Sequence, residues 1–213
     1  MKIQVSIDLL SLDRAMNLLQ EVAAYIDVIE AGTPLIKQEG LKVVETFKQH
    51  FPDKLIFADM KTMDAGELEA EIAFKAGADF TTILAVANDA TIAGALAAAR
   101  KYNKTVCVDL IGVPDRVSRT QELGKLGVSF VELHSGLDEQ ALGRSGLSEL
   151  QAFSNSVKIP FSVGGGINEH TILQVEAAGA NTVAIGAAIY ASSSPGEVAR
   201  RLREKITRVP LVS

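Results

Sequence analysis

The segment Asp59-Met60-Lys61-Thr62-Met63-Asp64 brings two carboxylates and an ammonium close together in the sequence. It follows the apolar run 55–58, which is typical of a buried strand, and precedes residues 65–75, which have the spacing of a helix. Side chains at positions i and i+2 of an extended segment point to the same side, so Asp59 and Lys61 should emerge together. If this strand belongs to a barrel, the ligand of this charged pair is a substrate.

Short apolar runs alternate with helical patterns along the whole chain, and no change in composition marks a linker. The predicted strands are Ile3–Ile7, Asp27–Glu30, Leu55–Ala58, Phe80–Leu84, Thr105–Val108, Phe130–Leu133, Phe161–Val163 and Thr182–Ile185. The predicted helices are Asp13–Val22, Gly40–Gln49, Ala65–Lys75, Ala90–Arg100, Arg116–Leu126, Glu139–Phe153, Glu169–Ala178 and Gly196–Ile206.

A repeated junction supports this order of elements. The phrases 74–79 and 176–181 share one form, and residues 124–128 are a looser copy: a helix ends at a glycine and a strand follows at once. Glycine supplies the left-handed residue that stops a helix. Strand–helix pairs repeated in this way predict an α/β fold, a (β/α)8 TIM barrel formed as a single domain over residues 1–213. The alternative is an open doubly wound sheet.

Active sites of such barrels lie at the carboxyl ends of the strands, so the residues at those ends are the candidates for chemistry. Those residues are Asp8, Glu30, Asp59, Lys61, Asp109 and His134, followed by Gly164-Gly165-Gly166 and by Gly186-Ala187-Ala188. A single buried carboxylate here could be a helix cap or half of a salt bridge. The convergence of the whole set on one mouth predicts a functional site.

Several of these residues suggest particular roles. The glycines after the last two predicted strands favour phosphate binding by backbone N–H groups, although tight turns alone would also use glycine. Glu30 and Asp59 are hard oxygen ligands that suit Mg²⁺, the alternative being an ionic cluster with Lys61. His134 ends a strand and is a candidate proton carrier rather than a structural histidine. His50 and His170 are expected on helix surfaces.

Composition narrows the class of protein. The chain has 213 residues, of which 47% are hydrophobic, and a net charge of −5, which argues against a general binder of nucleic acid or membrane surfaces. The single cysteine, Cys107, lies in an apolar run and is expected to be a buried thiol. The N-terminus has no signal-peptide core, and no stretch is long and apolar enough to span a bilayer. A cytoplasmic protein is expected.

Together these motifs resemble the orotidine monophosphate decarboxylase superfamily, whose hallmark is Asp-x-Lys-x-x-Asp, here Asp59, Lys61 and Asp64. The resemblance covers nearly the full chain. The other matching blocks are Val5–Asp8, Ile29–Pro34, His134–Gln140 and Val163–Ile167. Within the superfamily the closest resemblance is to the branch of 3-hexulose-6-phosphate synthases and 3-keto-L-gulonate 6-phosphate decarboxylases.

Two departures separate the members of this branch. The decarboxylases have arginines after the strand-six histidine and one in the strand-eight phosphate loop. Here those positions are residues 135–137, Ser-Gly-Leu, and Ala187. The departures favour the synthases, with the decarboxylase as the alternative and a noncatalytic sugar-phosphate-binding barrel as a more distant one.

The resemblance implies a reversible aldol reaction in which formaldehyde and D-ribulose 5-phosphate give D-arabino-3-hexulose 6-phosphate. It implies that Mg²⁺ on Glu30 and Asp59 stabilises a 1,2-enediolate, with Lys61 adding positive charge. His134 would be the base. Asp8 would hold a substrate hydroxyl, and Asp109 would orient the groups beside it. Members of the family are homodimers with shared active sites, which implies that Asp64 reaches the partner's site.

Overall fold

The structure, a computed structural model, describes residues 1–143 and 146–207. Eight parallel strands, each hydrogen-bonded to the next, form a closed barrel in which β1 also pairs with β8. The strands are β1 Lys2–Ile7, β2 Val28–Ala31, β3 Leu55–Thr62, β4 Phe80–Leu84, β5 Thr105–Asp109, β6 Val131–His134, β7 Phe161–Gly164 and β8 Thr182–Ile185. The barrel predicted from the sequence is confirmed, and the open sheet is excluded.

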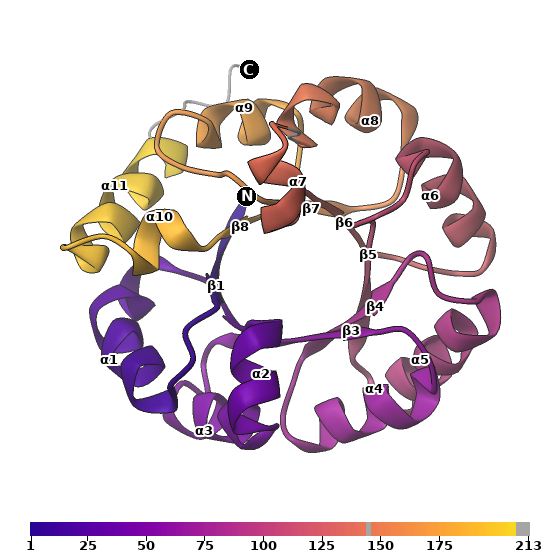
Figure 1. Cartoon of the computed structure of the whole chain (residues 1–213), viewed down its shortest axis with the longest axis horizontal. Helices are drawn as coiled ribbons and strands as arrows, with labels where there is room; N and C mark the ends of the chain where they lie inside the picture. Colours follow the sequence, from indigo (N-terminus) through magenta and orange to yellow (C-terminus); the bar gives the residue numbers. More distant parts are fainter. Residues whose placement is uncertain (144–145, 208–213) are drawn as a thin grey trace.

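Helices surround this ring of strands (Figure 1). The α-helices are α1 Leu12–Val22, α2 Thr33–Glu39, α3 Lys42–His50, α4 Gly66–Lys75, α5 Asp89–Tyr102, α6 Arg116–Lys125, α7 Leu137–Ala141, α8 Leu150–Ser156, α9 Ile172–Ala177, α10 Ala187–Tyr190 and α11 Pro195–Thr207. Two 3-10 turns, η1 Ala23–Tyr25 and η2 Gly146–Ser148, complete the set. In the described part of the chain, no helix has the length and apolar character needed to cross a membrane.

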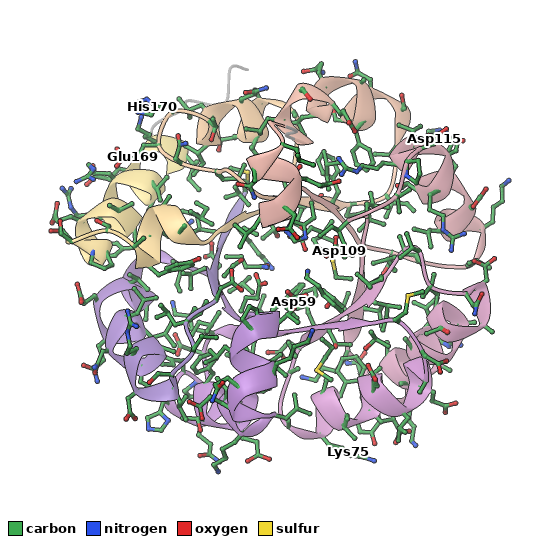
Figure 2. The ribbon with its side chains drawn as sticks, in the orientation of Figure 1. Asp59, Lys75, Asp109, Asp115, Glu169 and His170 are labelled. Atoms are coloured by element: carbon green, nitrogen blue, oxygen red, sulfur yellow. The ribbon has the colours of Figure 1, made fainter. Side chains whose placement is uncertain are left out.

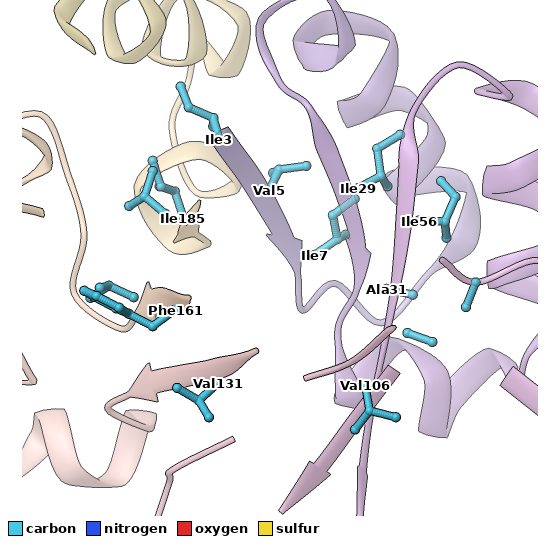
Figure 3. Close-up of a cluster of buried hydrophobic side chains, with 14 of the residues drawn as sticks. Ile3, Val5, Ile7, Ile29, Ala31, Ile56, Val106, Val131, Phe161 and Ile185 are labelled. Atoms are coloured by element: carbon cyan, nitrogen blue, oxygen red, sulfur yellow. The ribbon is translucent and has the colours of Figure 1, made fainter. Parts of the chain in front are cut away.

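Successive side chains of each strand point to opposite faces of the barrel wall, so the core has an outer and an inner layer. Ile3, Val5 and Ile7 of β1 are fully buried and belong to the large cluster between the strands and helices (Figure 3). Gln4 and Ser6, which lie between them, point to the other side and contact Glu30 of the neighbouring strand. The outer layer therefore holds the barrel to its helices, while the inner layer is free to carry polar groups.

The predicted junctions occur where expected. Helix α4 ends before Gly77 and α9 before Gly179, and both glycines have positive φ, 102° and 80°. In each case the next strand starts within a few residues, which sets the spacing of the βα repeats.

Three predicted segments differ from the structure. Strand β3 continues to Thr62 instead of ending at Ala58, and its register with β4 shifts between those residues. The predicted helix 139–153 is wrong: α7 ends at Ala141 and Gly143 has φ 73°, a conformation that interrupts a helix; residues 144–145 lie outside the described residues. Helix α9 is shorter than predicted, so His170 lies in the exposed turn before it rather than on a helix.

Candidate active site

A cavity of about 330 Å³ lies at the carboxyl ends of the strands. Eleven of the residues predicted from the sequence line it: Asp8, Glu30, Asp59, Lys61, His134, Gly164, Gly165, Gly166, Gly186, Ala187 and Ala188. They come from strands or loops on every side of the mouth except that of β4 and β5. Barrel closure is what brings these distant parts of the sequence to one place.

Two predicted residues lie elsewhere. Asp109 at the end of β5 is fully buried, does not line the cavity, and contacts two side chains of the cavity wall, Lys61 and His134. In Figure 2 the labels of Asp109 and Asp59 both lie near the middle of the ring of strands. Asp64 is exposed in the loop between β3 and α4 and does not line the cavity of its own chain.

Lys61 is held between two carboxylates. Its Nζ lies 2.8 Å from Oδ2 of Asp109 and 3.1 Å from Oδ2 of Asp59. Burial of the ammonium lowers its pKa, but the charges of Asp59 and Asp109 raise it more, so the pKa lies well above its ordinary value. Lys61 is therefore a fixed positive charge at the edge of the cavity.

The backbone of β3 has an unusual conformation at the residue that carries this charge. Lys61 has φ 47°, which is unusual for a residue with a side chain, and its N–H donates to Thr82 Oγ1 at 2.8 Å. Thr82 Oγ1 in turn donates to Asp59 Oδ1 at 2.7 Å, and Thr33 Oγ1 donates to Asp59 Oδ2 at the same distance. Hydroxyl groups from α2 and β4 thus orient both oxygens of Asp59. The side chains of Asp59 and Lys61 lie side by side, as the sequence predicts.

His134 is bound to Asp109. Its Nδ1 lies 2.9 Å from Asp109 Oδ2. A carboxylate acceptor favours the tautomer with the proton on Nδ1, which leaves Nε2 as the basic atom. Burial lowers the pKa of His134, but the charge of Asp109 and this hydrogen bond outweigh it and raise the pKa to about 9. For Asp109, burial raises the pKa, but His134 and Lys61 outweigh burial and lower it.

The carboxyl group of Glu30 is buried and accepts hydrogen bonds at one of its two oxygens. Gln4 Nε2 donates to its Oε2 at 2.6 Å, and the Ser6 hydroxyl donates to the same oxygen. Burial first, then the charges of Asp59 and Glu132, raise the pKa of Glu30 well above its ordinary value. Burial also raises the pKa of Asp8. The cavity thus holds more carboxylate than its cations neutralise.

Sequence reasoning missed two titratable members of the wall: Tyr190 of α10, and Glu132 on β6, which is 5% exposed. It also missed the orienting groups of Asp59 and Glu30. The available signal was spacing, because Glu132 lies two residues before His134 and so faces the same side of the strand.

Among the described residues, one group of side chains lies close enough together to hold a metal ion. Ligand atoms of Asp109, Glu132 and His134 all lie within 4.8 Å of one another. This is a different set from the pair Glu30 and Asp59, which lines the same cavity from the other side of the mouth. A carboxylate-rich site for a divalent metal is consistent with both.

Comparison with known proteins identifies the family. The model of the orotidine 5'-phosphate decarboxylase / HUMPS family matches residues 1–202. The chain belongs to this family. Its resemblance to the 3-hexulose-6-phosphate synthases within it is confirmed: it is 54% identical to the synthase of Mycobacterium gastri over 206 residues, 97% of this chain and all of the relative.

Solved structures agree with the sequence relatives. A crystal structure of a 3-hexulose-6-phosphate synthase superposes with a TM-score of 0.93 at 54% identity, covering 96% of this chain and 99% of the other. The 3-keto-L-gulonate-6-phosphate decarboxylase of Vibrio cholerae has a TM-score of 0.84 at 30% identity, covering 98% and 99%. The chain is an enzyme of the aldehyde-lyase class, and its identity is higher to the synthases than to this decarboxylase.

Proposed function

We propose that this enzyme joins formaldehyde to D-ribulose 5-phosphate, reversibly, to form D-arabino-3-hexulose 6-phosphate. The observation that carries the proposal is the cluster in which Asp109 bridges Lys61 and His134 at the wall of the strand-end cavity. Such a cluster suits removal of a proton next to a carbonyl. The match to synthases along nearly the whole chain supplies the substrate class.

His134 is the proposed base for the C1 proton of the ketose phosphate. Asp109 holds the imidazole by Nδ1, so Nε2 is directed away from that carboxylate. The same carboxylate stabilises the imidazolium that forms when Nε2 takes the proton. Asp109 is in this view a positioning residue.

Lys61 is the proposed electrostatic partner of the intermediate. Loss of the C1 proton leaves a 1,2-enediolate whose negative charge needs stabilisation. The ammonium is held in place by Asp59 and Asp109, so little reorganisation is needed when that charge develops.

The part of the cavity formed by the loops after β7 and β8 would hold the phosphate group of the substrate. Gly164, Gly165 and Gly166 after β7, with Gly186 and Ala187 after β8, line this side of the wall. Their backbone N–H groups and small side chains allow close approach of phosphate oxygens. Asp8, on the neighbouring strand, would accept a hydrogen bond from a substrate hydroxyl.

Glu30 and Asp59 would hold Mg²⁺. The fit is good because, among the described residues, both hydrogen bonds to the Glu30 carboxyl group go to Oε2 and none to Oε1, and because the pKa of Glu30 is raised by burial and by other carboxylates. Hard oxygen donors of this kind suit magnesium. When bound, Mg²⁺ supplies positive charge that stabilises negative charge developing on the substrate.

A homodimer with shared active sites completes the proposal, with Asp64 acting in the partner's site. Two observations support it: Asp64 is exposed and does not line the cavity of its own chain, and Met63 beside it is 52% exposed. Leu68 and Ile72 on the adjoining helix α4 are also exposed apolar side chains, of the kind that a second copy would cover. A cytoplasmic location, suited to a buried free thiol at Cys107, remains part of the proposal.

The decisive assay compares two reactions in the purified enzyme. Formaldehyde-dependent consumption of ribulose 5-phosphate with formation of a hexulose phosphate is the expected result. Release of CO₂ from 3-keto-L-gulonate 6-phosphate, without the condensation, would show the decarboxylase instead. Binding of ribulose 5-phosphate with no exchange of its C1 proton would show a noncatalytic barrel.

A further inference from the structure

Helix α7 forms part of the cavity wall without being packed into the core. Leu137 and Gln140 of this helix line the cavity, and in Figure 1 the helix lies nearer the centre of the ring than α6 and α8 do. None of its five residues, 137–141, is buried, and Leu137 is 71% exposed. Packing of an apolar face usually fixes the position of a helix in a protein. The position of α7 therefore depends on other contacts.

Two side chains tie α7 to its surroundings in the described part of the chain. Gln140 Nε2 donates to the carbonyl oxygen of Ser135 at 2.7 Å, a contact within the loop that carries the helix. Glu139 accepts hydrogen bonds from Arg116 Nη2 at both carboxylate oxygens, at 3.3 Å to Oε1 and 3.2 Å to Oε2. Because Arg116 is the first residue of α6, the second contact ties α7 to a separate element of the barrel.

The surroundings of Arg116 favour this role. Its side chain is only 9% exposed, and arginine is rarely buried to this extent unless it is paired. Nη1 lies 3.4 Å from Oε2 of Glu149, just before α8, so the guanidinium lies between carboxylates of two different segments. The rigid, planar guanidinium fixes the geometry of its partners better than a flexible ammonium does.

The two ion pairs of Arg116 differ in their exposure to water. The side chain of Glu139 is 25% exposed, whereas that of Glu149 is 59% exposed. Water and salt screen an exposed ion pair more strongly, so the pair with Glu139 should contribute more. Glu149 therefore provides a matched control for Glu139.

We propose that Arg116 is a positioning residue that holds α7 at the cavity through its ion pair with Glu139. Arg116 does not itself line the cavity, so it acts on a bound molecule through Leu137 and Gln140 of the helix. The inference rests on the proposed function for the identity of the substrate. It deepens that function by naming a residue that sets how tightly the sugar phosphate is held.

Loss of this ion pair should weaken binding more than it slows proton transfer. When only a fraction of the protein has α7 in the position that binds substrate, the apparent affinity falls by that fraction. Lys61, Asp109 and His134 are held by one another at the ends of other strands, so the substrate that does bind should still react. A purely structural defect would instead reduce both binding and reaction.

The first test compares Glu139→Ala with Glu149→Ala. Alanine favours helix formation, so the first substitution removes the ion pair without disfavouring α7 itself. The dissociation constant for ribulose 5-phosphate, measured by calorimetry, should rise about tenfold in Glu139→Ala, within the range found for coupled groups in contact. The kcat for exchange of the C1 proton with deuterium oxide should stay within about twofold, and Glu149→Ala should change neither quantity by more than that. An unchanged dissociation constant, or an equal loss in kcat, would overturn the proposal.

A second set of variants tests whether Arg116 acts through Glu139. Arg116→Gln should weaken binding as Glu139→Ala does, and combining the two substitutions should weaken it little further. Arg116→Lys, which keeps the charge, should recover part of the affinity. Fully additive losses in the double variant, or no recovery in a folded Arg116→Lys protein, would count against the proposed coupling.

Amide hydrogen exchange in the enzyme without substrate separates this inference from the proposed function. Exchange at residues 137–141 should be about tenfold faster in Glu139→Ala than in Glu149→Ala, since the ion pair restrains α7 whether or not substrate is present. Equal exchange rates would overturn the positioning role. Faster exchange in Glu139→Ala, in an enzyme whose unaltered form does not bind ribulose 5-phosphate, would support the positioning role and show that the proposed function is wrong.

Discussion

Asp109 joins two cationic side chains through a single oxygen, Oδ2, at 2.8 Å from Lys61 and 2.9 Å from His134. Its other oxygen accepts the backbone N–H of Ile111. Removing Lys61 would take the ion-pair partner from the buried carboxylate of Asp59 and leave Asp109 paired with His134 alone. Loss of one partner of a buried ion pair typically costs about 3–5 kcal/mol. The residues that would act on substrate are therefore also part of what stabilises the mouth of the barrel.

The pH dependence of proton exchange should report this arrangement. His134 acts as a base only when neutral, and its pKa in the folded protein is raised to about 9, so kcat/KM for exchange should rise with pH and level off above that value. In Asp109→Asn the negative charge that raises the pKa is lost, so the rise should move to lower pH. Measurement by NMR in buffered deuterium oxide checks this. A profile that does not move on substitution would contradict the role of Asp109.

A second prediction at this scale concerns the metal. Glu30→Gln removes one charged ligand and should preserve the fold, by circular dichroism, while greatly weakening turnover supported by Mg²⁺ and the binding of Mg²⁺ in calorimetry. Glu45→Gln, on the exposed surface of α3, is the matched control and should change neither. Full activity after exhaustive chelation would rule the metal out.

At the scale of elements, the strand ends were predictable because parallel strands of a barrel all present their carboxyl ends at one mouth. Seven strands lie within one residue of their predicted bounds. The extension of β3 was not predictable, because the positive φ of Lys61 and the register shift depend on hydrogen bonds from β4. Glu132 was missed because a lone glutamate between Val131 and Leu133 looks like the solvent side of a strand until the barrel closes around it.

The loop after β7 gives a prediction about phosphate binding. Gly165 has φ 97°, and a Cβ there would lie 2.2 Å from the carbonyl oxygen of Ser135. Gly165→Ala should therefore push this loop away from the β6 loop. A displacement of about 1 Å can cost up to about a hundredfold in kcat/KM.

The matched control is Gly166→Ala. This position has a similar positive φ, 71°, but a Cβ there would meet only Gln140 Oε1, at an ordinary 3.6 Å. Both variants carry the left-handed backbone penalty of about 1–2 kcal/mol, so the difference between them isolates the collision. Steady-state kinetics with ribulose 5-phosphate should show the larger loss in Gly165→Ala. Equal losses would mean that the loop geometry does not set substrate binding.

At the scale of the whole molecule, Asp64 was placed by resemblance alone, because spacing shows only that it lies beyond the strand end. The described chain leaves it exposed, at a groove lined by residues of α4 and α5. In a shared site it would balance the charge of the partner's Lys61 and hold that ammonium in place.

Complementation tests this arrangement. Inactive Asp64→Ala and Lys61→Ala chains are mixed under conditions that allow subunits to exchange. If Asp64 acts in the partner's site, a mixed dimer has one doubly damaged site and one intact site, so activity should partly return. Mixed dimers confirmed by native mass spectrometry but lacking activity would place Asp64 in the site of its own chain.

The pairing of β1 with β8, which closes the barrel, has a consequence for folding of the chain during synthesis. Lys2 to Val5 pair with Thr182 to Ile185, so β1 gains this neighbour only after the last strand of the barrel, β8, has been synthesised. Until then that edge of β1 is unpaired. Closing such a long-range contact is slow compared with local helix formation. Any open sheet that forms before β8 joins β1 would carry two unpaired edges, and those edges would be its parts most vulnerable to aggregation.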